Sequence, residues 1–244
     1  MNLEEHFNSK KSLKLFGLSR YFNFFKNLYI SNKLPHVNLI SGKKGMGKAT
    51  LVNHFLYFIL DKDNYDLNSQ CLINNEFHKK FLNNLVPELI YLSGSEFKNI
   101  KIENIRKLKN EITKSHFGLK DRFIILDNVD NFNDQTLNAM LKIIEEPNKK
   151  DYFFLINNET KPILNTIKSR CIETKILLKT SEKKDIITKL IKFHNEVPVL
   201  NDKYMDISPG NFLKFNFIIN KFNIDLKSEF ISNLNLSLNL YKKN

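Results

Sequence analysis

Short apolar runs of strand length alternate, over the first two thirds of the chain, with longer segments of helical periodicity. HVNLIS (36–41), PELIYLSG (87–94) and YFFLIN (152–157) each predict a strand. The run FIIL within RFIILDNVD (122–130) is apolar at four successive positions, so we expect it to be buried on both faces. Strands of this kind are typical of the middle of a parallel sheet.

The segments between these runs have helical spacing. KATLVNHFLYFIL (48–60) has helical length and a broad apolar face, and the polar stretch 61–70 after it predicts a loop. IKIENIRKLKNEI (100–112) places isoleucine or leucine every three or four residues, and DQTLNAMLKIIEEP (134–147) has a similar face that Pro147 ends. Strands that alternate with helices predict an α/β fold with a mainly parallel sheet.

The pattern changes after residue 179. SEKKDIITKLIKFHN (181–195) begins with a serine that can cap a helix and keeps helical periodicity without another buried strand. The tail LNLSLNL (234–240) alternates like a strand but is too short and polar to classify. We therefore predict a core domain at 1–178, a small helical domain at 179–218 and a C-terminal segment at 219–244.

The formal net charge of +12 has two interpretations. Lysine and arginine displace counterions from phosphates, so the charge is compatible with attraction to nucleic acid. However, Lys, Asn, Ile and Phe dominate the composition and tryptophan is absent, as an A/T-rich coding sequence would produce regardless of function. The lysines are scattered along the chain, and the sequence contains no stripe of arginines. Both observations favour the compositional interpretation of the charge.

Cysteine usage and hydropathy give further expectations. Cys71 and Cys171 have neither metal-ligand spacing nor the pattern of a disulfide framework, so we expect a reducing compartment and no metal site. FLYFIL (55–60) is among the longest apolar stretches and is far shorter than the roughly 18 residues that span a bilayer. The N-terminus lacks the apolar region of a signal peptide. We expect a soluble, cytoplasmic protein with no membrane partner.

The stretch SGKKGMGKAT (41–50) matches a phosphate-binding loop between a strand and a helix. Gly42, Gly47 and Lys48 have GxxxxGK spacing, and Gly45 lies within the same loop. In such loops, backbone N–H groups and the helix N-terminus converge on phosphate, and the lysine supplies a mobile positive charge. Lys48 is therefore the residue that we expect to contact phosphate.

The set of residues that ATP hydrolysis requires is incomplete in this sequence. A hydroxyl residue normally follows the lysine and binds magnesium, but Ala49 has no oxygen. Thr50 comes one position late, and we expect it to face a different side of the helix. Asp127, after FIIL, is well placed to hold a metal, whereas Asn128 cannot act as a general base. The alternative to a phosphate site is a tight turn with a solvated lysine.

The segment 127–171, which runs from DNVDNFND through LNAMLKIIEEP to SRC, resembles the AAA+ subunits of sliding-clamp loaders. The glycine loop and the helical segment 100–112 agree with this resemblance, which extends from about residue 15 to residue 215. It implies an AAA+ P-loop core domain followed by a small helical lid. It also implies a role in the DNA polymerase III holoenzyme, a nucleotidyltransferase complex.

In that family, Ser169, Arg170 and Cys171 would form a motif presented to the neighbouring subunit's ATP, with Arg170 as an arginine finger. A planar, permanently charged guanidinium can stabilise a transferred phosphoryl group across an interface. The alternative for Arg170 is a surface residue that caps a strand starting at Cys171. We assign Cys171 to packing. Asn158 falls at the family's sensor position, and the alternative is that it simply ends a strand.

The chain departs from the family pattern in its lid and beyond. SPGNFLKF (208–215) resembles the lid segment in which active relatives carry an arginine after glycine, but here the residue is Asn211. A four-cysteine zinc module found in many relatives is missing. Only 34 residues follow Gly210, fewer than the roughly 40 that an independent collar domain requires. Whether the collar is abbreviated or the chain truncated stays open.

The resemblance implies a clamp-loader subunit that supplies Arg170 in trans, hydrolyses little or no ATP and requires no cofactor; whether ATP occupies its loop stays open. Its partners would be the ATPase subunits and the delta subunit of a hetero-oligomer and, through that complex, the sliding clamp and primed DNA. One alternative is a self-sufficient P-loop AAA+ ATPase of replication or repair, against which Ala49, Asn128 and Asn211 argue. Another is a module that binds nucleic acid directly through its charge.

Overall fold

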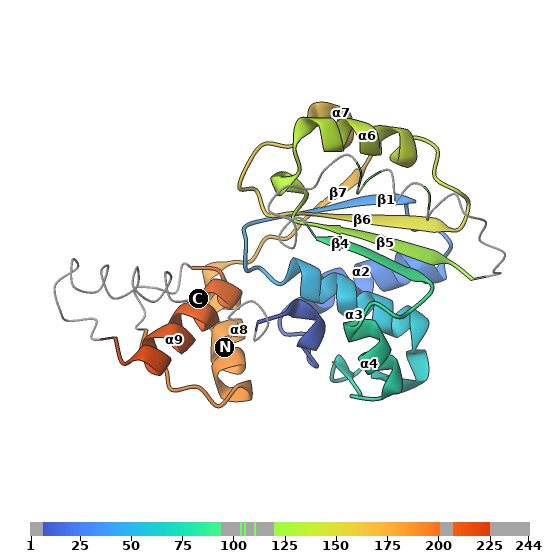
Figure 1. The fold of residues 1–244 in the computed structure, drawn as a ribbon. Helices are drawn as coiled ribbons and strands as arrows, with labels where there is room; N and C mark the ends of the chain where they lie inside the picture. Colours follow the sequence, from blue (N-terminus) through green and yellow to red (C-terminus); the bar gives the residue numbers. More distant parts are fainter. Residues whose placement is uncertain are drawn as a thin grey trace.

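A five-stranded parallel sheet forms the centre of the protein (Figure 1). The computed structural model describes residues 7–93, 103, 105, 110, 120–200 and 207–224. In sheet order the strands are β4 (Leu89–Ser93), β5 (Arg122–Asp127), β6 (Asp151–Asn157), β1 (Val37–Ser41) and β7 (Ile172–Lys175). Every pairing between neighbours is parallel, which confirms the predicted α/β fold.

The middle strands are buried because helices cover both faces of the sheet. All five residues of β1 are buried, whereas three of the four residues of the edge strand β7 are exposed. Alternate residues of one strand enter different apolar clusters: Phe154 and Ile156 pack on one face, and Phe153 and Leu155 on the other. The continuous apolar runs therefore have the physical origin expected for a parallel sheet.

Helices α2 (Ser19–Ile30), α3 (Lys48–Leu60) and α4 (Glu76–Leu82) lie on one side of the sheet, and α6 (Asp134–Ile144) and α7 (Asn165–Lys168) lie on the other (Figure 1). Helix α2 was not predicted. Of the predicted helix at 100–112, Glu103, Ile105 and Asn110 are described as helical, and the remainder lies outside the described residues.

Several short elements complete the core. They are the 3₁₀ turns η1 (Ser9–Lys11), η2 (Lys62–Asn64) and η3 (Val129–Asn131) and the hairpin strands β2 (Tyr65–Asp66) and β3 (Cys71–Leu72). The prediction of a loop over 61–70 was wrong where η2 and β2 form. Tyr65 is buried there against Phe22, with ring centroids 5.5 Å apart, so a tertiary contact holds an otherwise polar segment.

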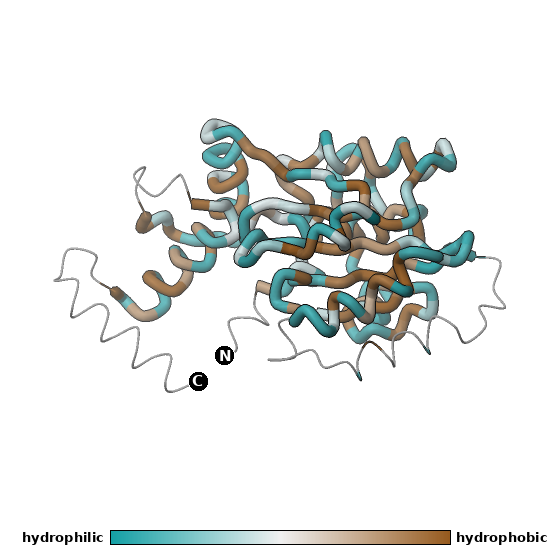
Figure 2. Tube along the Cα trace, turned by 90° about the horizontal axis from the view of Figure 1, so that it is seen from above, coloured by the Kyte–Doolittle hydropathy of each residue, from teal (hydrophilic) through white to brown (hydrophobic). Residues whose placement is uncertain are grey.

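Two helices, α8 (Thr180–Phe193) and α9 (Pro209–Phe222), follow the last strand and are called the lid below. They lie to one side of the sheet, whose strands contain much of the hydrophobic sequence (Figure 2). Ile187, Leu200 and Phe212 form a separate small apolar cluster between them. The boundary that we drew at residue 218 falls inside α9, and the alternating tail at 234–240 lies outside the described residues.

No helix in the described part of the chain is both long enough and apolar enough to cross a membrane.

Candidate functional site

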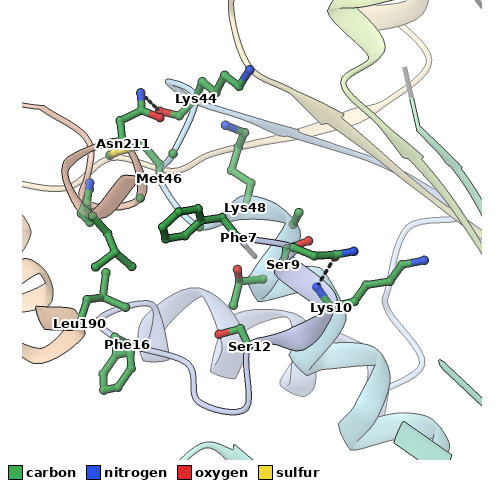
Figure 3. Close-up of a pocket in the computed structure, with 18 of the residues that line it drawn as sticks. Phe7, Ser9, Lys10, Ser12, Phe16, Lys44, Met46, Lys48, Leu190 and Asn211 are labelled. Carbon is green, nitrogen blue, oxygen red and sulfur yellow. Dashed lines mark hydrogen bonds between the residues drawn. The ribbon is translucent and has the colours of Figure 1, made fainter. Parts of the chain in front are cut away.

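A cavity of about 580 Å³ opens where the loop between β1 and α3 faces the lid (Figure 3). We call it the loop cavity, and residues 42–47 the glycine loop. Its lining comes from the glycine loop, the start of α3, the N-terminal segment 7–18, the ends of β4 and β5, and both lid helices. Of the predicted site residues, it contains Gly45, Gly47, Lys48, Thr50, Asp127 and Asn158.

The glycine loop has positive φ angles at its three glycines. Gly42, Gly45 and Gly47 all have positive φ, and Gly47 is the N-cap of α3 at φ 82°. A side chain on Gly45, whose φ is 85°, would lie 2.4 Å from the Ser208 hydroxyl oxygen of the lid. Glycine is thus required both for the turn and for the close approach of the lid.

Lys48 is buried and turned back onto its own loop. Its Nζ donates to the carbonyl oxygens of Gly42, at 2.5 Å, and Lys43, at 2.9 Å. Burial lowers the Lys48 pKa to about 8, against the opposing influence of Asp127, Asp130 and Glu159. An anion entering the cavity would therefore compete with the loop carbonyls for this ammonium group.

The residues after Lys48 bear on metal binding. Ala49 and Thr50 are both among the residues that line the loop cavity, and it stays a prediction that Thr50 faces a different side of the helix. Both residues belong to the first turn of α3. No hydroxyl is present at Ala49, the position where a phosphate-binding loop places its magnesium ligand.

Asp127 ends β5 beside the loop, as predicted, but its carboxylate already has partners. Oδ2 accepts a hydrogen bond from the Tyr91 hydroxyl at 2.8 Å, and Oδ1 accepts one from the Asn128 N–H at 2.8 Å. Burial raises the Asp127 pKa, although these two hydrogen bonds and Lys48 oppose the rise. These two hydrogen bonds use one acceptor site on each carboxylate oxygen, so the Tyr91 hydroxyl and the Asn128 N–H fix the orientation of the carboxylate.

Asn128 and Asn158 lie side by side at the ends of β5 and β6. Asn128 has left-handed backbone geometry, with φ 55°, and its side-chain oxygen accepts a short hydrogen bond from Asn158 Nδ2. The predicted sensor residue is therefore bound to the residue that replaces the expected acid. This pair places two neutral amides where an acidic residue would orient water in a hydrolysing relative.

The same turn contains an acidic residue that the sequence did not single out. Asp130 accepts hydrogen bonds from the N–H groups of Asn158 and Thr160, both at 3.1 Å, and from the Thr160 hydroxyl. Burial raises its pKa, but these hydrogen bonds outweigh that effect and lower the pKa below its usual value. Asp130 thus fixes the chain that follows β6.

The lid contacts the glycine loop directly. Ser208 Oγ donates to the Lys44 carbonyl at 2.6 Å, and the Gly210 N–H donates to the Gly45 carbonyl at 2.8 Å. Asn211 Nδ2 also donates to the Lys44 carbonyl, at 3.3 Å, as drawn in Figure 3. Asn211, at the position where the resemblance led us to expect an arginine, therefore contacts the loop backbone.

The N-terminal segment forms a wall of the cavity that sequence reasoning missed. Lys10 is buried, its Nζ lies 3.7 Å from the centre of the Tyr91 ring, and it donates to Asn84 Oδ1 at 2.6 Å. Phe16 packs against Phe193 of α8 with ring centroids 5.4 Å apart. These partners are distant in sequence, so no local motif could have indicated them.

Arg170 lies elsewhere, in the turn between α7 and β7, and is not among the described residues that line the loop cavity. Its side chain is 36% exposed and forms an ion pair with Glu145, which follows α6. Cys171, the next residue, is buried, and burial raises the pKa of its thiol to about 12. A protonated, buried thiol supports the assignment of Cys171 to packing.

Comparison with known proteins gives a family match over most of the chain. The family model described as DNA polymerase III, delta subunit, matches residues 17–181. A DNA polymerase III subunit delta' of Buchnera aphidicola (subsp. Baizongia pistaciae) is 28% identical over 148 residues, which cover 58% of this chain and 44% of that protein. The delta' subunit of Bacillus subtilis is 29% identical over 156 residues, with 62% and 45% covered.

A DNA polymerase III subunit gamma of Buchnera aphidicola (subsp. Acyrthosiphon pisum) is 29% identical over 164 residues, which cover 66% of this chain and 43% of that protein. The chain thus spans about half the length of the curated relatives it matches. Among solved structures, the Thermotoga maritima RuvB Holliday junction branch migration motor has a TM-score of 0.52 at 12% identity, with 88% of this chain and 66% of that chain covered.

The RuvB likeness concerns the fold alone and agrees with an α/β P-loop domain of the AAA+ type. All three sequence relatives are named as subunits of DNA polymerase III. The matched range includes the glycine loop, the strand that ends at Asp127 and the turn that carries Arg170. The chain therefore belongs to the DNA polymerase III, delta subunit family of clamp-loader proteins.

Proposed function

We propose that this chain is a delta-prime-type clamp-loader subunit that supplies Arg170 in trans to the ATP of a neighbouring subunit and hydrolyses little or no ATP itself. It would assist the ATP-dependent loading of a sliding clamp at primed DNA. Its partners would be ATPase subunits of the gamma type, a delta subunit and, through the complex, the clamp and DNA. Family membership supports the general role, and the residues around Arg170 and Lys48 support the finer assignment.

The position of Arg170 carries the proposal. Its guanidinium is partly exposed on a turn whose neighbours Ile167 and Cys171 are buried, and it lies outside the chain's own loop cavity. A charged, planar group held on the surface by a rigid turn is suited to reach a phosphate bound by another subunit.

The loop cavity supports the second half of the proposal. Lys48 is bound by its own loop, Ala49 offers no metal ligand, and Asp127 is engaged by Tyr91. Asn128 stands where a general base would be needed. We infer that the cavity retains the shape of a nucleotide site, through Gly42, Gly45, Gly47, Lys48, Thr50, Asp127 and Asn158, without the groups that drive hydrolysis.

The test is reconstitution of the complex with its cognate ATPase and delta subunits. We expect Arg170→Ala to lower clamp- and DNA-stimulated ATP turnover by roughly 10³-fold or more, as loss of an arginine finger does. Assembly of the mutant complex is checked by size-exclusion chromatography, because a broken interface would mimic the loss of a finger. Unchanged turnover in an intact mutant complex would contradict the proposal.

The competing function is a self-sufficient AAA+ ATPase, which the open cavity beside Lys48 favours. Under that reading, the isolated chain hydrolyses ATP and Lys48→Ala abolishes the reaction. We expect the isolated chain to have no turnover above the mutant's background. A Lys48-dependent rate would establish the competing function instead.

A further inference from the structure

The ion pair between Glu145 and Arg170 holds one edge of the guanidinium. Glu145 Oε1 accepts from Arg170 Nε at 2.8 Å and lies 2.5 Å from Nη2. Nη1 donates to the Thr166 carbonyl at 2.9 Å and makes a longer contact of 3.4 Å with Ser169 Oγ. The carboxylate and the α7 carbonyl therefore determine the plane in which the guanidinium lies.

These contacts leave the Nη1–Nη2 edge of the guanidinium, called the outer edge here, for another ligand. The group has five N–H donors, whereas Nε, Nη1 and Nη2 each have one oxygen within 3 Å. Within the described residues, the other hydrogens on Nη1 and Nη2 have at most the long Ser169 contact. An arginine binds phosphate in a bidentate manner through such a pair of parallel N–H groups.

The backbone at Arg170 is held in place by its neighbours. The position of the guanidinium therefore depends on the side-chain torsion angles of Arg170. Ile167 is fully buried below the turn, and the N–H groups of Arg170 and Cys171 donate to carbonyls of Ile167 and Lys168. A long arginine side chain nevertheless loses substantial conformational entropy when it is held in one geometry. A contact that fixes these torsions before the phosphate arrives reduces that cost at the moment of reaction.

Helix stability does not explain why a carboxylate lies at this position. Glu145 is the C-cap of α6, where a negative charge interacts unfavourably with the partial negative charge of the helix end. Its side chain is 42% exposed, and a pair with such exposure contributes little to the stability of the fold. A glutamate here is better accounted for by its effect on Arg170.

We propose that Glu145 is a positioning residue that holds Arg170 by its Nε–Nη2 edge, so that the Nη1–Nη2 edge faces a phosphate bound by the neighbouring subunit. This inference rests on the proposed function. It assigns Glu145 no contact with the nucleotide. The Glu145 carboxylate and the Thr166 carbonyl together hold the guanidinium in place, and the neighbouring subunit supplies the remaining ligand.

The experiment uses the reconstituted complex and compares Glu145→Ala with the matched control Glu146→Ala, which removes the same group one position away. We expect Glu145→Ala to lower kcat for ATP by between about 10- and 100-fold, as a misplaced catalytic group does, with an unchanged KM. Glu145→Gln keeps an oxygen that can accept from Nε and should retain most of the turnover. Glu146→Ala should match the unsubstituted complex.

A double-mutant comparison distinguishes failure of the positioning role of Glu145 from failure of the proposed function. In the Arg170→Ala background, Glu145→Ala should cause no further loss, because the two residues act as one unit. A loss that persists in that background, or equal effects of the Glu145 and Glu146 substitutions, would overturn the positioning role while leaving the proposed function intact. If Arg170→Ala alone leaves turnover unchanged, the proposed function fails, and the role of Glu145 fails with it.

Discussion

His54 is a fully buried residue of α3 whose two ring nitrogens both have partners. Nδ1 lies 3.0 Å from the Tyr65 hydroxyl oxygen, and Nε2 lies 3.0 Å from the Ser12 carbonyl oxygen. Burial lowers its pKa to about 4; the Ser12 carbonyl opposes this and nearby His78 adds to it. The neutral imidazole therefore joins α3 to the N-terminal segment and to the hairpin.

This environment predicts acid destabilisation. The unfolded chain binds the proton with a pKa near 6.5, so stability is fully present above that pH and is lost as the pH falls toward about 4. We expect the free energy of unfolding to drop by about 2 kcal/mol between pH 7.5 and pH 5 from this residue. Urea unfolding at both pH values measures the drop.

The control for His54 is a substitution that cannot titrate in this range. His54→Gln should lower stability at pH 7.5 but reduce the difference between the two pH values. An undiminished difference in His54→Gln would assign the acid sensitivity to another group, such as His78, whose pKa burial also lowers.

At the scale of elements, the first turn of α9 and the glycine loop form one unit. Three hydrogen bonds join them, from Ser208, Gly210 and Asn211 to the carbonyls of Lys44 and Gly45. These carbonyls belong to the loop whose other carbonyls bind Lys48. The lid therefore rests on the loop through polar main-chain contacts and not through apolar packing alone.

Gly45→Ala tests this junction. The new Cβ would lie 2.4 Å from Ser208 Oγ and 2.9 Å from the Asn211 nitrogen, on a residue with φ 85°. We expect a loss of about 1–3 kcal/mol in the stability of lid docking, observed as faster amide exchange at residues 210–213. Ser208→Ala removes one hydrogen bond without a clash and should cost about 1 kcal/mol. Equal protection in all three proteins would contradict the coupling.

The elements that could be predicted are those with a local signal. Strands β1, β5 and β6 were visible as apolar runs because both of their faces are buried. Lys48 was visible from the spacing of its loop, and Asp127 because it ends an apolar run. Helix α2 was missed although Phe22, Phe25 and Tyr29 have helical spacing, since its aromatic residues are also common in strands. Its buried face packs on α3, where the Phe25 and Phe55 ring centroids are 5.8 Å apart.

The parts of the site that could not be predicted depend on contacts between distant segments. Tyr91 reaches Asp127 because β4 and β5 are neighbours in register, with Tyr91 opposite Ile125 and Ser93 opposite Asp127. Nothing near Tyr91 in the sequence indicates this partner. The orientation of Lys48 toward its own loop is likewise a property of the folded loop and not of the GxxxxGK spacing.

At the scale of the whole molecule, the net charge of +12 predicts weak attraction to DNA without sequence preference. The isolated chain should bind duplexes of different sequence equally, and binding through about three or four phosphates should weaken on the order of 100-fold between 50 and 200 mM salt. Fluorescence anisotropy measures both properties. A clear preference for one sequence, or affinity that persists at high salt, would contradict this expectation and favour a dedicated nucleic-acid surface.

The N-terminal segment also determines when the fold can be completed. Phe16 packs on Phe193 and Phe7 on Phe217, so this segment finds partners that lie far later in the sequence and are synthesised after it. During synthesis on the ribosome, the sheet and α3 can assemble while this segment still lacks its lid partners. The wall of the loop cavity would then close as a late event, after α9 has left the exit tunnel.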